Sequence, residues 1–384
     1  MANAKEKLKK EVTVSSRFAY VDALRGIAIA LVFVVHAGSY SGLRGIAKPF
    51  ANAGQMGVQL FFVISAFTIF YSLSRRKTDD PHLIGNFFIR RLFRIIPVYW
   101  MGIVLYTAVY GLASRSNLPG PEVWHYPFHI LLINLFHPEV TSSVVPGGWS
   151  ISCEVIFYCM VPFLFRLCQT IKGALGFLVF SITVLPLLNL GLQRLLAPYF
   201  GDVDSLLLRL FYYRSILNQI GCFAVGFLVF HFTSRVKDSA MFTRKSSNFG
   251  LLTVCLFLCL CLVRFQPPFI GTHFLYSILF GVIALCLSVF PWAILVNSFT
   301  IFLGRISFSC YLIHFLVLKQ VALHLPWMAE NHGPGRILNF VVMFLLCLFA
   351  TIPLAALSYR FVEVPAMALG KSVSRLWLNR PLKA

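Results

Sequence analysis

Residues 19–37 read AYVDALRGIAIALVFVVHA, a run that is apolar except for a few polar side chains. A helix of about 20 apolar residues, rising about 1.5 Å per residue, is long enough to cross the hydrocarbon core of a membrane. Three ionisable residues interrupt this run: Asp22, Arg25 and His36. Each costs free energy in a bilayer, so it marks a cavity or a partner inside the protein. We therefore interpret residues 19–37 as a spanning helix that carries a functional site.

The rest of the chain is also rich in apolar residues. Its 384 residues are 58% hydrophobic and only 12% charged, and 39 of them are Phe. A soluble domain has about 25% charged residues, so the composition predicts that the chain lies in a membrane. Ten apolar runs are long enough to span it and predict an all-α, polytopic membrane helix bundle. The runs are 19–37, 57–74, 93–111, 151–167, 173–190, 214–232, 249–264, 273–291, 300–322 and 337–358.

The distribution of charge predicts the topology. The net charge is +20, and with a cytoplasmic N-terminus most Lys and Arg residues fall in the segments on the cytoplasmic side. This bias predicts an even number of spans and two cytoplasmic termini. The Lys-rich start of the chain does not resemble a cleavable signal peptide. We expect a basic tail at 1–18, one membrane domain at 19–366 and a second basic tail at 367–384.

The composition also indicates which kinds of partner the chain binds. Topology and lipid contact account for the excess of cations, so we expect a lipid bilayer and no nucleic acid as partner. The basic bias fits a multi-pass protein of a bacterial inner membrane. The ten Cys residues lie almost all in apolar runs and include no CxxC pair, which predicts neither a disulfide framework nor a metal site.

Helical spacing relates the ionisable residues of the first span. Arg25 and His36 are eleven positions apart, which places them within about 20° of one face and roughly 16 Å apart along the axis. Asp22 is close to that face. A long anionic ligand could lie along this stripe, with phosphates at Arg25 and its reactive end at His36, whose imidazole suits proton transfer. The alternative is a local Asp22–Arg25 pair with an interfacial His36.

A cluster of arginines follows the second span on the predicted cytoplasmic side. Arg90 and Arg94 share a helix face, and Arg91 lies on the adjoining row. Guanidinium groups bind phosphates through paired donors. The cluster therefore predicts a phosphate site, with topology and anionic lipid as the alternative explanation.

Two further segments carry polar residues. In Trp149-Ser150-Ile151-Ser152-Cys153-Glu154, we expect Glu154 to lie at about the depth of His36, where a carboxylate could orient the imidazole; the alternative is a carboxylate that caps a helix start. Ser307, Tyr311 and His314 follow i, i+4, i+7 spacing and form a polar stripe. Near the inner end of the last span, Glu363 could pair with an inner arginine. We interpret His314 and Glu363 as structural or binding residues.

In this order, the segments resemble the acyltransferase 3 family of integral membrane acyltransferases. The resemblance covers about residues 17–366. Its second-span motif is Val58–Phe67, which includes Ser65 and has Ala66 where the family usually has Gly. The other matching segments are Leu24–Ala28 with His36, Arg90–Pro97, Trp149–Glu154, Ser307–His314 and the Glu363/Pro365 ending.

The resemblance implies a ten-helix enzyme that moves an acyl group, usually acetyl, from cytoplasmic acyl-coenzyme A to a hydroxyl of an extracytoplasmic glycan or similar acceptor. It implies that His36 and Arg25 are important. We expect His36 to act as general base or as transient acyl carrier, with Glu154 orienting it and Asp22 pairing with Arg25. The residues expected to hold the phosphates of acetyl-CoA are Arg25, Arg90, Arg91, Arg94 and Arg305.

Two alternative functions, both non-enzymatic, remain open for this chain. A transporter or flippase of an anionic or acylated compound would also need spans and buried charges. A membrane scaffold without a small-molecule site is the third reading, and the ionisable residues of the first span argue against it. Turnover of a thioester would separate the enzyme from the transporter.

Overall fold

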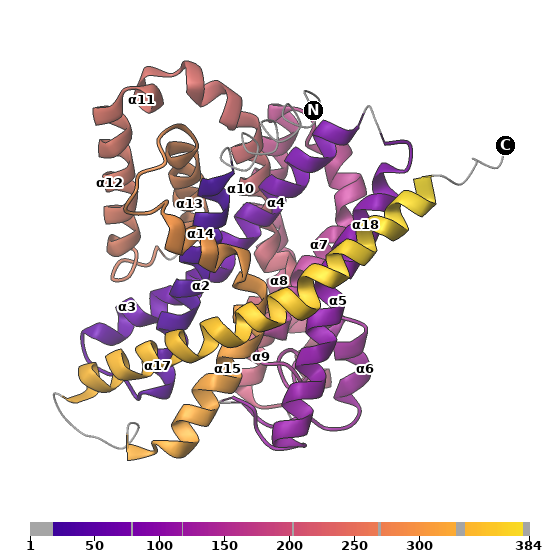
Figure 1. The fold of residues 1–384 in the computed structure, drawn as a ribbon, viewed down its shortest axis with the longest axis vertical. Coiled ribbons are helices and arrows are strands. Elements are labelled where there is room, and N and C mark those ends of the chain that lie inside the picture. The colour runs from indigo at the N-terminus through magenta and orange to yellow at the C-terminus, as the bar shows by residue number, and fades with distance from the viewer. Residues whose placement is uncertain are drawn as a thin grey trace, which may run out of the picture.

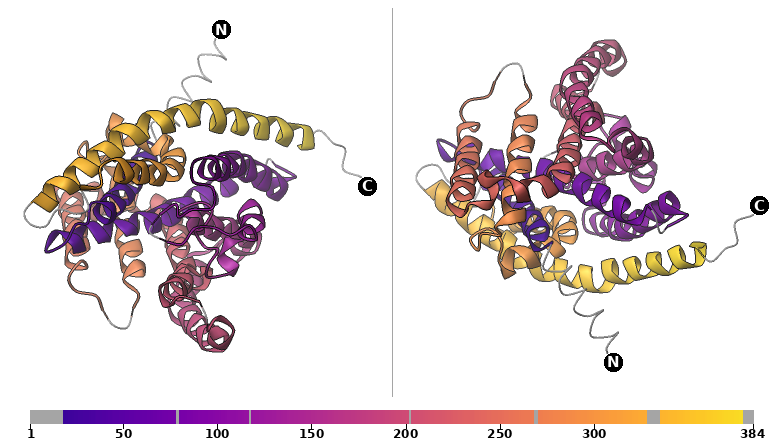
Figure 2. Two further views of the ribbon diagram at one scale, coloured as in Figure 1. Left: turned by 90° about the horizontal axis from the view of Figure 1, so that it is seen from below. Right: turned by 90° about the horizontal axis from the view of Figure 1, so that it is seen from above.

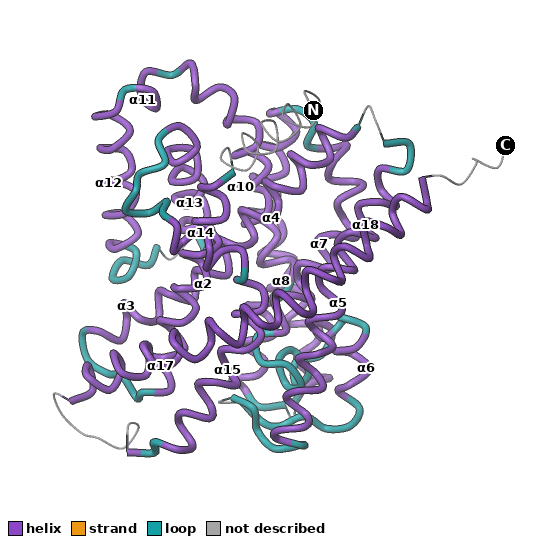
Figure 3. Tube along the Cα trace, in the orientation of Figure 1, coloured by secondary structure: helices purple, strands orange, loops and turns teal. Residues whose placement is uncertain are grey.

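The structure, a computed structural model, describes residues 18–77, 80–116, 118–201, 203–267, 270–327 and 335–378. All regular secondary structure in these ranges is helical, as Figure 3 shows. The predicted N-terminal tail 1–18 lies outside the described residues except for Phe18. The predicted C-terminal tail begins as part of a helix that ends at Leu378. The all-α fold class is confirmed.

The helices occur in the following order. They are α2 (Ala19–Tyr40), α3 (Ala47–Ala53), α4 (Gly57–Arg76), α5 (Leu83–Tyr110), α6 (His125–Ile130), α7 (Gly148–Leu167), α8 (Ile171–Leu196), α9 (Ser205–Arg214), α10 (Ile216–Arg235), α11 (Ala240–Thr243), α12 (Lys245–Cys261), α13 (Thr272–Val289), α14 (Ser298–Arg305), α15 (Ser307–His324), α17 (Gly335–Ser358) and α18 (Val364–Leu378). Short 3₁₀ turns and one π-helical segment, Tyr359–Glu363, connect some of them.

The predicted spans all coincide with helices. Eight stretches of the described chain are long and apolar enough to cross a membrane. The predicted span 300–322 corresponds to α14 and α15, which are bent by 80° at a short break and count as a ninth if taken together. The predicted span 249–264 corresponds to α12, an apolar helix of 17 residues. A multi-pass membrane bundle is confirmed, whereas the total of ten spans and the cytoplasmic termini remain predictions.

Helix α2 lies in the middle of the bundle, packed against α4, α14, α15 and α17 (Figure 1). Its contact with α14 is unusually close. A Cβ atom on Gly26 would collide with the backbone carbonyl of Thr300, and one on Gly304 would collide with the carbonyl of Asp22. Small residues permit such close approach of two membrane helices. The contact brings Arg305, at the end of α14, beside the first turns of α2.

The last two helices form one long rod. Helix α17 passes through the π-helical segment into α18, and in Figures 1 and 2 the rod runs along one side of the bundle, across α15 and α5. A π-helical segment inserts an extra residue into the helical repeat and so shifts the face that the following residues present. Here the segment ends at Glu363, whose side chain is buried.

We call the end of the bundle where α2 begins the inner end, and the opposite end the outer end, following the predicted topology. At the outer end, the described residues between Leu112 and Gly147 form a folded segment that connects α5 to α7 and includes α6, in the lower part of Figure 1. Arg115 is fully buried there and donates hydrogen bonds to the carbonyl groups of Val144 and Gly111 and to the hydroxyl of Tyr126. A further hydrogen bond, from Arg115 to the hydroxyl of Thr107 at 3.1 Å, joins the segment to α5.

Candidate active site

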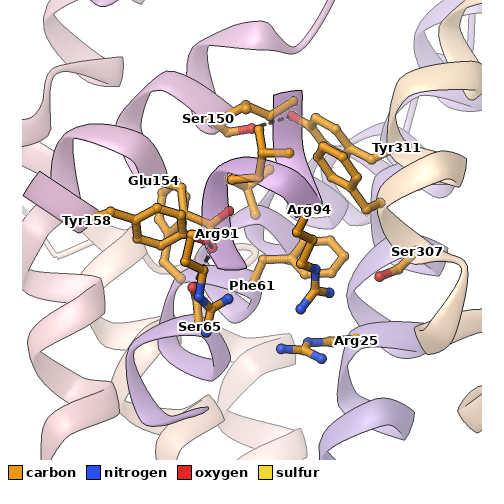
Figure 4. A pocket seen from close by; sticks show the side chains of 15 residues that line it. Arg25, Phe61, Ser65, Arg91, Arg94, Ser150, Glu154, Tyr158, Ser307 and Tyr311 are labelled. Carbon is orange, nitrogen blue, oxygen red and sulfur yellow. Dashed lines mark hydrogen bonds between the residues drawn. The ribbon is translucent and has the colours of Figure 1, made fainter. Parts of the chain in front are cut away.

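A polar cavity opens between α2, α4, α5, α7 and α15, and we call it the inner cavity (Figure 4). Three arginines line it: Arg25 from α2, and Arg91 and Arg94 from α5. In Figure 4 their guanidinium groups gather on one side of the cavity. Glu154 is the only carboxylate among the described lining residues. The surplus of positive charge suits an anionic ligand, because guanidinium groups bind phosphate or carboxylate oxygens through paired donors.

Glu154 is engaged by two hydroxyl groups within the inner cavity. Its Oε1 atom accepts hydrogen bonds from Ser65 of α4 and from Tyr158, one helical turn further along α7, at 2.5 Å for the Tyr158 hydroxyl. The guanidinium of Arg91 lies over the Tyr158 ring, 5.3 Å from its centroid. Glu154 therefore belongs to the arginine side of the site. The expected contact between Glu154 and His36 is not formed, since His36 lines a different cavity.

The expected pair of Asp22 and Arg25 is present. Their charged groups are 3.7 Å apart, at i, i+3 on α2, and Asp22 also lies 3.9 Å from Arg305. The Arg305 side chain is 55% exposed and does not line the inner cavity. Asp22 therefore balances part of the positive charge beside the cavity. Because residues i and i+3 are neighbours on the surface of a helix, this pair could be predicted from sequence spacing alone.

Arg90 also lies outside the lining of the inner cavity. Its guanidinium is 3.9 Å from the carboxylate of Asp80 and donates a hydrogen bond to Ser374 of α18 at 3.4 Å. Of the five arginines expected to hold coenzyme phosphates, the structure thus brings together Arg25, Arg91 and Arg94. It places Arg90 and Arg305 in ion pairs at the edge of the region.

His36 lines a second cavity, which we call the outer cavity. Its ring packs against Phe315 and His314 of α15, with centroids 4.3 Å and 5.3 Å away. Within the described chain, His36 makes no hydrogen bond or ion pair. The neighbouring His314 is fully buried; its Nδ1 lies 3.2 Å from the Cys310 carbonyl oxygen, and its Nε2 has no partner in the described chain. The His36 imidazole is therefore free to interact with a ligand in the outer cavity.

Two residues line both cavities, Val58 and Tyr311. The Tyr311 hydroxyl donates to the Gly147 carbonyl at 3.1 Å and accepts from Ser150 at 2.8 Å. Gly147 has φ of +77°, and a Cβ atom there would lie 2.9 Å from the Tyr311 hydroxyl, so the glycine permits the contact. We call Val58 and Tyr311 the partition, because they lie between the arginines on one side and His36 on the other.

The remaining predicted residues fall around these cavities. Ser307 lines the inner cavity and Trp149 the outer one. Glu363, in the π-helical segment of the rod, is buried and accepts a hydrogen bond from Ser309 at 3.2 Å. Within the described residues, no group of three or more His, Cys, Asp or Glu side chains is arranged to hold a metal ion.

The sequence interpretation missed several polar residues of the outer cavity. The buried amide of Gln59 donates to the amide oxygen of Gln219 at 3.0 Å and lies 3.4 Å from the Tyr213 hydroxyl. Arg214, which was not predicted as a site residue, also lines this cavity. The signal that could have found them is a pair of glutamines within apolar runs, since an amide in a membrane needs a polar partner.

Comparisons with known proteins show which family the chain belongs to. A family profile described as an acyltransferase domain matches residues 18–360. A Staphylococcus aureus (strain COL) protein named "Putative O-acetyltransferase" is 27% identical over 367 residues, which cover 90% of this chain and 56% of that protein.

Two further relatives are similar. The Bacillus subtilis protein named "Putative peptidoglycan O-acetyltransferase YrhL" is 26% identical over 92% of this chain and 56% of its own length. "Peptidoglycan O-acetyltransferase OatA" of Listeria monocytogenes is 25% identical over 90% of this chain and 55% of its own. The chain therefore spans a little over half the length of these curated relatives. No solved structure gives a significant match.

Proposed function

Because this chain belongs to the acyltransferase 3 family, whose domain profile it matches over residues 18–360, we propose that it is a membrane O-acyltransferase. It moves an acyl group, most simply acetyl, from acyl-coenzyme A on the cytoplasmic side to a hydroxyl of an extracytoplasmic glycan. The named activity of its relatives, O-acetyl transfer, supports the reaction class. A bacterial inner membrane is the location that suits such a donor and such an acceptor.

The observation that carries the proposal is the meeting of two different cavities at one partition. The inner cavity offers Arg25, Arg91 and Arg94, and the outer cavity offers His36. Coenzyme A is a polyanion with a thioester at the end of a long arm. Its phosphates suit the arginines, and its arm is long enough to carry the thioester to the partition. The coenzyme and the acceptor then bind on opposite sides of the partition, and their reacting ends meet there.

The chemistry needs one base and one leaving group. His36 takes the proton of the acceptor hydroxyl while the hydroxyl oxygen attacks the thioester carbonyl carbon. The new C–O bond replaces the C–S bond, and the coenzyme leaves as a thiolate that is then protonated. General base catalysis of this kind contributes on the order of 10²- to 10⁴-fold. If His36 instead carries the acyl group transiently, the same residue performs both half-reactions.

The other site residues have supporting roles in this scheme. Glu154, held by Ser65 and Tyr158, limits the repulsion between Arg91 and Arg94 when no ligand is bound. Asp22 does the same for Arg25. Because peptidoglycan appears in the names of two relatives, a cell-envelope glycan is the acceptor class that we propose.

Release of free coenzyme A thiol from acetyl-CoA tests the proposal, using the protein in nanodiscs with a glycan acceptor present. We expect turnover by the wild type and a loss on the order of 100-fold or more in His36→Ala, with acetyl-CoA still bound. Arg25→Ala and Arg94→Gln should weaken acetyl-CoA binding by about tenfold each, since each removes a charge-assisted contact. His324→Ala and Arg166→Gln, at exposed positions, are matched controls.

Two outcomes would count against the proposal. A His36→Ala variant that inserts normally and works at the wild-type rate would remove His36 from the mechanism. If the wild-type protein neither binds acetyl-CoA nor releases thiol, the alternative that it is a transporter is favoured.

A further inference from the structure

The outer cavity contains a cation that the proposed chemistry does not use. Arg214 is the last residue of α9, where the chain turns at Ser215 before α10 begins. Its side chain lines the outer cavity together with His36. An arginine of the same helix, Arg209, is exposed instead. Topology and lipid contact explain an exposed arginine at the outer end of a span, but they do not explain one that faces a cavity.

Neutral groups hold the Arg214 guanidinium in place. Its Nη1 atom donates to the hydroxyl of Thr141 at 3.0 Å and lies within 3.4 Å of the hydroxyl of Ser142. The guanidinium carbon lies 5.6 Å from the ring centroid of Trp149. The Nη2 and Nε atoms make no hydrogen bond to the described residues. The guanidinium is therefore fixed on one side and retains donors for a ligand on the other.

Arg214 has no counter-ion in the described part of the chain. None of the described residues that line the outer cavity is Asp or Glu, and no ion pair joins Arg214 to a carboxylate. By contrast, Asp22 lies beside Arg25 and Arg305. A cation removed from bulk water is costly unless an anion and its hydrogen bonds compensate it. The geometry therefore leaves room for an anion brought in by a ligand.

The rest of the lining suits hydroxyl groups. The Oε1 atom of Gln59 is buried and has no hydrogen-bond partner among the described residues. Ser39 and Tyr40 of α2 line the cavity on the same helix as His36. Neutral acceptors and donors of this kind bind sugar hydroxyls, whereas Arg214 is the group that would bind a negative charge.

We propose that Arg214 binds an anionic group of the acceptor, a carboxylate or a phosphate, and so makes an acidic sugar the preferred acceptor over a neutral one. This inference rests on the proposed function, because it takes the outer cavity as the place where the acceptor meets His36. A charge-assisted contact of this kind changes affinity on the order of 10- to 100-fold.

Binding of three related sugars to the wild type in phosphatidylcholine nanodiscs tests the inference. N-acetylglucosamine is neutral, N-acetylmuramic acid adds a carboxylate to the same ring, and N-acetylglucosamine 1-phosphate adds a phosphate. We expect at least one acidic sugar to bind about tenfold more tightly than the neutral one. The acidic sugar with the larger gain in affinity shows whether the preferred anion is a carboxylate or a phosphate.

Variants assign the preference to Arg214. Arg214→Gln should remove the gain for the acidic sugar and leave the affinity for N-acetylglucosamine unchanged, and Arg214→Lys should keep part of the gain. Arg209→Gln, from the exposed face of the same helix, should behave as wild type. Acetyl-CoA binding serves as the folding check, because it depends on the inner cavity.

Equal binding of the three sugars by the wild type would overturn the inference, even if no Arg214 variant folds. So would an equal loss for neutral and acidic sugars in a folded Arg214→Gln variant. If Arg214→Gln instead changes only the binding of phosphatidylglycerol added to the nanodisc, Arg214 is a lipid contact and the inference fails. Failure of the proposed function is distinct, since it shows as absent acetyl-CoA binding and turnover.

Discussion

His129 shows what a single buried residue contributes at the outer end. Its Nδ1 lies 2.7 Å from the hydroxyl of Tyr99, and its Nε2 lies 2.7 Å from the carbonyl oxygen of Val140. The imidazole joins the folded segment 112–147 to α5. Burial lowers the pKa of the His129 imidazole to about 3, so it is neutral over the physiological range.

The lowered pKa of His129 predicts an acid-sensitive outer end. An unfolded histidine has a pKa of about 6.5 and takes up a proton below it, whereas folded His129 does not. The contribution of His129 to stability is therefore complete above pH 6.5 and falls as the pH drops, by about 2 kcal/mol at pH 5. The midpoint of thermal unfolding, measured at pH 7.5 and pH 5, should decrease for the wild type.

A variant isolates this contribution. His129→Gln should show a smaller decrease between the two pH values, because glutamine does not titrate. His125 and His137, whose pKa values are also lowered by burial, remain in the variant and account for part of the dependence. Parallel pH curves for the two proteins would show that His129 does not contribute.

At the scale of helices, the close contact of α2 and α14 is the most vulnerable packing feature. Gly304→Ala places a methyl group against the backbone of Asp22, which cannot move without shifting α2. We expect a loss of about 1–3 kcal/mol or more from overpacking, and a weaker contact between Asp22 and Arg305. Fluorescence-monitored thermal unfolding in detergent should show a midpoint lower by several degrees.

Gly176→Ala is the matched control for this substitution. Gly176 lies in α8 with open space around its Cα, so the added methyl group meets no other atom. Alanine is the better helix former, and the control should be neutral or more stable by about 0.5–1 kcal/mol. Equal effects of the two substitutions would mean that the α2–α14 contact adjusts freely.

Some features of the helices could be predicted from the sequence, and others could not. Apolar length identifies the helices, because a span of about 20 residues is dictated by the bilayer alone. The Asp22–Arg25 pair follows from helical spacing within one element. The bend of 80° between α14 and α15 does not follow from apolar length, since residues 300–322 read as one run.

Contacts between helices were less predictable. Whether Glu154 meets His36 or the arginines depends on how α7 is rotated against α2 and α5, and an apolar run does not encode that rotation. For the same reason the neighbours of His36 on α15 and the cavity position of Arg214 were not anticipated. The arginines Arg91 and Arg94 were predicted as a group because they lie on one helix.

At the scale of the whole molecule, the inner and outer cavities share the two lining residues of the partition. The partition consists of Val58 and Tyr311, and hydrogen bonds to Gly147 and Ser150 hold the tyrosine in place. Tyr311→Ala should join the cavities and let protons pass between them. In liposomes that contain a pH-sensitive dye, we expect faster collapse of an imposed pH gradient than with the wild type.

The control for the partition keeps the ring. Tyr311→Phe should remain closer to wild type, because the aromatic ring still fills the gap. Tyr199→Ala, at a position that is 80% exposed, should not alter permeability. Wild-type permeability in Tyr311→Ala would show that other side chains close the path.

The partition has an electrical consequence for the cell. If solvent enters the two cavities, most of the membrane voltage falls across the thin layer between them and not across the full thickness of the bilayer. Moving one elementary charge through that layer costs about 2.3 kcal/mol per 100 mV, whereas an acetyl group is neutral and crosses at no such cost. In the proposed reaction, the neutral acetyl group would therefore pass the partition without work against the membrane voltage, whereas a transferred charge would not.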